Sequence, residues 1–185
     1  MKIGGIMQVR GSAFKSILKY AEKKHGIERV KNFFIDNPSF CAIKDYIDLD
    51  WYDLKFYLDY SEKTDKYFGF GDGSLLFEAG EFASRQAFES SHRLFKDMTM
   101  QSALANAETV FLSYFSAAVV EIKYIKDNKA SIYIKNLPVS PYLAKNICGW
   151  IKHAVKSIKA KEPSITETTP KTCLCFTLEW INEPL

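Results

Sequence analysis

The 185-residue sequence predicts an α+β fold in which an N-terminal helical layer is followed by a small antiparallel sheet, built as hairpin, helix and hairpin. Apolar residues recur at helical spacing over most of residues 12–115, and from residue 118 the period changes to 2. A composition of 47% hydrophobic and 25% charged residues is typical of globular chains. Because no repeat or long linker divides the chain, we expect residues 1–185 to form a single domain.

The first two helices are predicted from caps and from one apolar stripe. Ser12 is a good N-cap residue, and Gly26 suits the left-handed cap after His25. His25 would also complement the dipole at the end of the first helix. A second, short helix is predicted over residues 27–34. The stripe of the first helix consists of Phe14, Ile17, Leu18 and Ala21.

Three further helices complete the predicted helical layer. Asp50 is expected to cap the third helix, and the glycine-rich residues 69–73 form a hinge into a fourth helix over residues 74–90. Gly80 in the middle of that helix costs about 1 kcal/mol relative to alanine, which predicts a close helix crossing or a kink. A fifth helix is predicted over residues 100–115.

The sheet is predicted from alternating segments and turn residues. Asp127-Asn128 forms the turn of the first hairpin, and Ser140-Pro141 has the residue order of a helix start. The sixth helix should then extend to about residue 160. The four predicted strands cover residues 118–124, 130–134, 164–168 and 172–180.

The charge distribution argues against specific nucleic-acid binding. The chain has 25 basic and 22 acidic residues, and only four of the basic residues are arginine, which is the preferred donor to phosphates and base edges. Residues 117–171 contain ten lysines and four acidic residues. We interpret this stretch as a solvated lysine face, and a weak anionic partner, either a protein or a membrane surface, is the alternative.

The sequence predicts a cytoplasmic protein without a membrane span. No apolar run reaches 18 residues, and residues 1–10 do not form a secretory signal. The four cysteines are therefore expected to be reduced.

Two local patterns that suggest ligand binding have simpler explanations. The glycines of residues 69–73 precede a helix, but they lack a phosphate-loop spacing, and Asp72 would repel a phosphate. The acidic run over residues 45–53 lacks the glycine and the closing glutamate of a calcium hand, so helix capping and solvation explain it better.

The cysteines give a weak indication of a metal site. Cys173 and Cys175 share one face of a predicted strand, and Cys148 or His153 on the preceding helix would have to complete the ligand set. The C-x₂-C spacing of common zinc sites is absent, and cysteines are frequent in cores. We therefore expect no metal and no other cofactor.

The sequence also lacks the usual catalytic motifs of a hydrolase. There is no G-x-S-x-G motif, and His25, His92 and His153 are the only histidines. We interpret His92 and His153 as surface residues. An enzyme assembled from scattered residues is the least favoured function.

Four short strings and the order of elements carry a resemblance to a known superfamily. It contains the H-NOX heme sensors, the vinyl-reductase-type ligand-binding domains and the Bet-type subunits of the TRAPP tethering complex. The chain most resembles an uncharacterised bacterial branch, known mainly as a domain of unknown function, and the likeness covers nearly the whole chain. The strings are Arg10-Gly-Ser-Ala-Phe14, Trp51-Tyr-Asp-Leu54, Glu78-Ala-Gly-Glu-Phe82 and Phe176-Thr-Leu-Glu-Trp180.

The sequence departs from the heme sensors of this superfamily at two motifs. Those sensors carry a proximal histidine on the helix before the first hairpin, whereas residues 103–111 contain no histidine or other suitable axial ligand. Their Tyr-x-Ser-x-Arg motif, which holds the heme propionates, has its nearest counterpart in residues 133–137, which keep the tyrosine but lack the serine and arginine. We therefore expect no heme. The paired cysteines of the vinyl-reductase-type domains have wider spacing than Cys173 and Cys175.

The resemblance implies a fold whose helices and sheet enclose an apolar cavity. We expect a non-enzymatic small-molecule-binding or sensory domain, whose ligand is an apolar or aromatic small molecule or a lipid and whose partner is a signalling protein. The alternative is a ligand-free dimerisation or scaffold module, and exposed hairpin edges leave a homodimer open. For each candidate pocket residue, ordinary core packing is the other explanation. The candidates are Phe82, Phe88, Phe111, Tyr114 and Tyr133.

Overall fold

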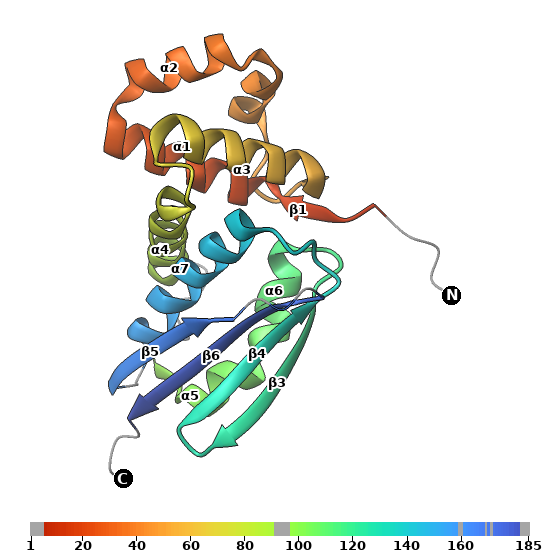
Figure 1. Cartoon of the computed structure of the whole chain (residues 1–185), viewed down its shortest axis with the longest axis vertical. Helices are drawn as coiled ribbons and strands as arrows, with labels where there is room; N and C mark the ends of the chain where they lie inside the picture. Colours follow the sequence, from red (N-terminus) through yellow and green to blue (C-terminus); the bar gives the residue numbers. More distant parts are fainter. Residues whose placement is uncertain (1–5, 91–96, 159–160, 169, 171, 182–185) are drawn as a thin grey trace.

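The computed structural model describes residues 6–90, 97–158, 161–168, 170 and 172–181, and it confirms the α+β class. Helices form the N-terminal part of the molecule, and a four-stranded antiparallel sheet forms the C-terminal part (Figure 1). One cluster of buried apolar side chains extends through both parts. None of the described helices is long and apolar enough to cross a membrane. The N-terminal helices are α1 (Gly11–His25), α2 (Ile27–Asp36), the 3-10 helix η1 (Pro38–Asp45) and α3 (Leu54–Phe68).

A two-stranded sheet at the start of the helical part was not predicted. Strand β1 (Gln8–Arg10) pairs in antiparallel fashion with β2 (Trp51–Asp53), and Val9 also bridges to Phe115. Short strands of three residues show too little alternation to be recognised in a sequence.

Two helix starts differ from prediction. Helix α1 begins at Gly11 after Arg10, and the Ser12 N–H donates to the Asp48 carbonyl oxygen, so Ser12 is not a cap. The prediction that Asp50 caps the third helix is also wrong. Because β2 occupies the intervening residues, Asp53 is the cap, and its carboxylate accepts the Phe56 N–H at 2.9 Å.

Helix α4 (Ser74–Glu89) matches its predicted range, whereas the predicted fifth helix is two helices, α5 (Met100–Ala105) and α6 (Ala107–Tyr114). The break lies at Asn106. Its side-chain amide donates to the Ser102 carbonyl oxygen at 2.8 Å, and its backbone N–H bonds to Ala103. A side chain that competes in this way for helical carbonyl groups interrupts the helix.

The C-terminal sheet has the strand order β3-β4-β6-β5, which confirms two hairpins separated by a helix. That helix, α7 (Pro141–Ser157), starts as predicted, because the Ser140 hydroxyl accepts the Leu143 N–H at 3.4 Å. Ile132 of β4 lies opposite Phe176 of β6, and both are buried. The strands are β3 (Val119–Lys126), β4 (Lys129–Lys135), β5 (Lys161–Glu167) and β6 (Leu174–Ile181).

Helices α4 and α7 cross with their backbones in contact, which confirms the close crossing predicted at Gly80. A Cβ atom at position 80 would lie 2.0 Å from the Asn146 carbonyl oxygen, and one at Gly149 would lie 1.9 Å from the Phe77 carbonyl oxygen. The Asn146 side-chain amide donates to the Leu76 carbonyl oxygen at 3.0 Å. Only glycine allows this approach on both helices.

Acidic side chains occupy the N-terminus of α4. The buried Asp65 carboxylate accepts the N–H groups of Gly73 at 2.8 Å and Leu75 at 3.1 Å. Asp72 accepts the Ser74 N–H at 2.9 Å. The glycine-rich loop therefore presents these amide groups to carboxylates of its own chain, which agrees with our rejection of a phosphate loop.

Substitution of Gly80 tests the helix crossing. We expect Gly80→Ala to lower the free energy of unfolding by about 3 kcal/mol, because the new methyl group forces α4 and α7 apart. Urea denaturation measures this value. Arg85→Ala, on an exposed position of the same helix, is the control and should change the stability by less than about 0.5 kcal/mol. Equal stability of the two variants would contradict the crossing.

Candidate functional site

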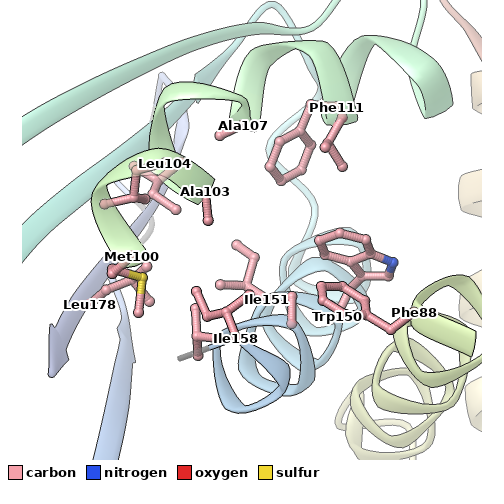
Figure 2. A pocket seen from close by; sticks show the side chains of 14 residues that line it. Phe88, Met100, Ala103, Leu104, Ala107, Phe111, Trp150, Ile151, Ile158 and Leu178 are labelled. Carbon is pink, nitrogen blue, oxygen red and sulfur yellow. The ribbon is translucent and has the colours of Figure 1, made fainter. Parts of the chain in front are cut away.

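An apolar cavity of about 70 Å³, which we call the inner cavity, lies between α5 and α6 on one side and α4 and α7 on the other. Figure 2 shows Phe111 facing Trp150 and Phe88 across this space. Ile132 and Leu178 line it from the sheet. Its remaining lining residues are Met100, Ala103, Leu104, Ala107, Val110, Ile151, Ala154, Val155 and Ile158.

A second cavity, the middle cavity, adjoins the inner one and has a volume of about 50 Å³. Both cavities are lined by Val110, Phe111 and Trp150, so these three side chains separate them. The middle cavity adds a few polar groups, from Ser16, Asn146 and Tyr114. The other lining residues are Ala13, Ala83, Phe115 and Ile147.

Trp150 is the centre of an aromatic cluster that fills the space around both cavities. Its ring centroid lies 6.3 Å from Phe88, 6.5 Å from Phe111 and 6.1 Å from Tyr114. Burial raises the pKa of the Tyr114 phenol, which therefore stays protonated near neutral pH. The space is thus reduced to two narrow apolar cavities beside a neutral phenol.

The structure brings together three of the five predicted pocket residues. Phe88, Phe111 and Tyr114 all line a cavity. Phe82 lies instead against Tyr20, with ring centroids 5.7 Å apart, and lines neither cavity. Tyr133 is also outside them: the strand alternation turns it away from the face of Ile132.

Trp150 was not among the sequence candidates, although a large aromatic side chain within the sixth predicted helix was a usable signal. Position 150 directly follows Gly149, where α7 touches α4. Its helix neighbours alone do not show that the indole reaches α6. That contact depends on the helix crossing, which the sequence indicated only through Gly80.

A polar hollow of about 550 Å³, which we call the mouth, lies beside the middle cavity and shares Ser16, Ala83 and Tyr114 with it. Lys15 and Lys19 of α1 line one side. The Arg10 side chain lines it near the end of α6, where its Nε donates to the Ser113 carbonyl oxygen at 3.2 Å. The remaining lining residues are Ser12, Asp48, Leu49, Gln86, Ala87, Ser90 and Ser113.

The cysteine candidates do not gather with other ligands. Cys148, Cys173 and Cys175 are buried free thiols, and burial raises the pKa of Cys148 to about 11. Such a thiol gives up its proton reluctantly, so it is a poor metal ligand. Within the described residues, no three His, Cys, Asp or Glu side chains are grouped closely enough to hold a metal ion.

The prediction that His153 is a surface residue is wrong. The ring is half-buried, and its Nδ1 lies 3.1 Å from the Ser84 hydroxyl and 3.3 Å from the Ser157 hydroxyl. Burial, with nearby Arg85, lowers the pKa of His153. Ser84 is fully buried, so a substrate could not reach the Ser84 hydroxyl beside His153. His92 lies outside the described residues.

Two other sequence interpretations concern charged groups. Burial lowers the pKa of His25, which weakens its expected role as a cation at the end of α1.

In the lysine-rich stretch of residues 117–171, five described lysines form ion pairs, for example Lys145 with Glu167 at 3.1 Å. These pairs reduce the positive charge that the stretch presents to an anionic partner.

Solved structures of H-NOX domains share the fold of this chain. An H-NOX double variant labelled Tt has a TM-score of 0.71 and 15% identity, covering 94% of this chain and 95% of its own. The Fe(II) unliganded H-NOX protein from K. algicida has a TM-score of 0.71 and 16% identity, with coverages of 95% and 98%. The Fe(II)NO form from S. oneidensis has a TM-score of 0.70 and 12% identity, with coverages of 94% and 99%.

The chain therefore has the fold of these H-NOX domains. Identities of 12–16% establish the fold alone. No protein-family model and no curated protein matches the sequence.

The lowered pKa of the half-buried His153 predicts how stability depends on pH. The pKa of His153 is lower in the folded chain than its ordinary value of 6.5, so its contribution to stability is present above about pH 6.5 and is lost as the pH falls. We expect the free energy of unfolding to decrease between about pH 7.5 and 5.5, and His153→Gln to reduce this slope. Urea denaturation at several pH values measures it. An unchanged slope in the variant would contradict the assignment.

Proposed function

We propose that this chain is a non-enzymatic sensory domain that binds a small apolar molecule in the inner and middle cavities. The observation that carries the proposal is the pair of adjoining cavities, whose lining residues are nearly all apolar. Concave apolar sites with a few polar groups are typical of small-molecule binding. The H-NOX fold supports a sensory role by analogy.

The proposal includes a single cytoplasmic domain over residues 1–185 that reports to a signalling partner. The four free cysteines favour a reducing compartment. We further propose that the chain is related to the vinyl-reductase-type and TRAPP Bet-type domains. This relationship is supported by the four sequence strings described above.

We also propose that the domain does not bind heme. The described residues that line the two cavities include no histidine or cysteine, and the Tyr114 phenol is held in its neutral form. Met100 would be the remaining axial donor, and its thioether is a weak ligand without a second strong one. The cavity volumes of about 70 and 50 Å³ are also far below the roughly 300 Å³ at which pockets for drug-sized ligands and cofactors begin, so the cavities suit only a ligand much smaller than a porphyrin. The residues present therefore do not fit the group.

Filling the inner cavity tests the proposed function. Ala103 and Ala105 both lie on α5, but only Ala103 lines the cavity, whereas Ala105 is exposed. We expect native mass spectrometry of the freshly purified wild-type protein to detect a retained small molecule. Ala103→Leu should abolish retention because the added methyl groups occupy the cavity, and Ala105→Leu should preserve it. A ligand-free wild type, or equal retention by both variants, would contradict the proposal.

A second candidate function is a homodimerisation module, which the edge strand β3 favours. Antiparallel pairing of two β3 strands centred on Ile122 places Glu121 of each copy opposite Lys123 of the other and Val119 opposite Ile125. Shifting the centre to Glu121 or Lys123 would set like charges opposite each other. Val119 and Ile125 are 42% and 54% exposed, so pairing would cover apolar surface.

Charge reversal on this strand tests the second candidate. Lys123→Glu places four carboxylates at the centre of the paired strands and should convert a dimer to a monomer in light scattering after size exclusion. Lys126→Glu is the control, because position 126 lies opposite Ala118 in this register. A wild type that is monomeric at all concentrations, or a dimer unaffected by Lys123→Glu, would exclude this pairing.

A further inference from the structure

The mouth carries a positive charge that neither cavity explains. Among the described residues, its lining contains the cations Arg10, Lys15 and Lys19 and one carboxylate, that of Asp48. Lys15 and Lys19 are one helical turn apart on α1, so their side chains project from the same face. The mouth therefore carries an excess of positive charge beside an apolar interior.

The three cations differ in how firmly they are held by their own chain. The Arg10 guanidinium donates to the Leu49 and Ser113 carbonyl oxygens and stacks 3.8 Å from the centre of the Trp51 ring. Lys15 Nζ pairs with Asp48 at 3.1 Å. Within the described residues, Lys19 has no hydrogen bond or ion pair, so its ammonium group is the one available to a ligand.

The mouth adjoins the middle cavity, which in turn adjoins the inner cavity. Ser16, Ala83 and Tyr114 line both the mouth and the middle cavity. Phe111 and Trp150, with Val110, line both the middle and the inner cavity. The three hollows therefore lie next to one another, from two lysines at the surface, beside a neutral phenol, to an interior whose described lining carries no charged group.

We infer that the ligand is an amphiphile with a carboxylate head and an aliphatic tail. The head binds in the mouth, with Lys19 as its main partner and Lys15 as a second, and the tail passes Tyr114 toward Trp150. An unbranched chain suits the cavities because they are narrow, while a charged group inside them would lose its hydration without compensation. This inference rests on the proposed function and adds the chemical class of the ligand.

Matched ligands separate the head from the tail. Isothermal titration of the full chain with decanoate and with 1-decanol compares the same tail with and without charge. We expect decanoate to bind about tenfold more tightly than 1-decanol, because its carboxylate gains one charge-assisted hydrogen bond. Lys19→Met should remove this advantage without changing the affinity for 1-decanol. Added salt should weaken decanoate binding only.

Two further variants make the outcome decisive. Lys63→Met, an exposed lysine on α3 that lines none of the three hollows, should leave both affinities unchanged. Ala103→Leu should weaken both ligands, because both tails need the inner cavity. Equal affinities for acid and alcohol, unaffected by Lys19→Met, would overturn the inference and leave the apolar site standing. If neither ligand binds, both the inference and the proposed function fail.

Discussion

The contact between the backbones of α4 and α7 is the constraint on which the rest of the molecule depends. Gly80 and Gly149 remove the side chains that would separate the two helices, and Asn146 then reaches both α4, through the Leu76 carbonyl oxygen, and the Tyr57 hydroxyl of α3 at 3.2 Å. Helix α4 packs on α1 and α3, while α7 packs on β5 of the sheet. The crossing therefore joins the helical part to the sheet part and fixes their relative position.

The same crossing determines the shape of the candidate site. Trp150 follows Gly149 directly, so its indole is held close to α4 and within reach of Phe111 and Tyr114 on α6. The aromatic cluster reduces the space between the helices to small cavities, and α1 adds lysines at the open end. The matched H-NOX structures from K. algicida and S. oneidensis are Fe(II) forms, whereas this chain presents a narrow apolar interior and a basic opening.

Most of the fold could be predicted from the sequence because periodicity and capping are local signals. The helix starting at Ser140-Pro141, the two hairpins and the crossing at Gly80 all depend on residues near in sequence. The predictions were wrong where the local structure depends on residues that are distant in the sequence. Strand β2 moved a cap from Asp50 to Asp53 only because β1 pairs with it. Aromatic content similarly led to five pocket candidates, of which Phe88, Phe111 and Tyr114 line a cavity. It did not distinguish them from Phe82 or Tyr133, because the direction of each side chain depends on packing between elements.

Titration with hemin tests most directly our proposal that this chain, which has the fold of H-NOX domains, does not bind heme. We expect the absorption spectrum of the equimolar mixture to equal the sum of free hemin and protein, since the cavities offer neither space nor a strong axial ligand. A saturable one-to-one change with a sharpened Soret band, lost when Met100 or Tyr114 is replaced, would contradict it.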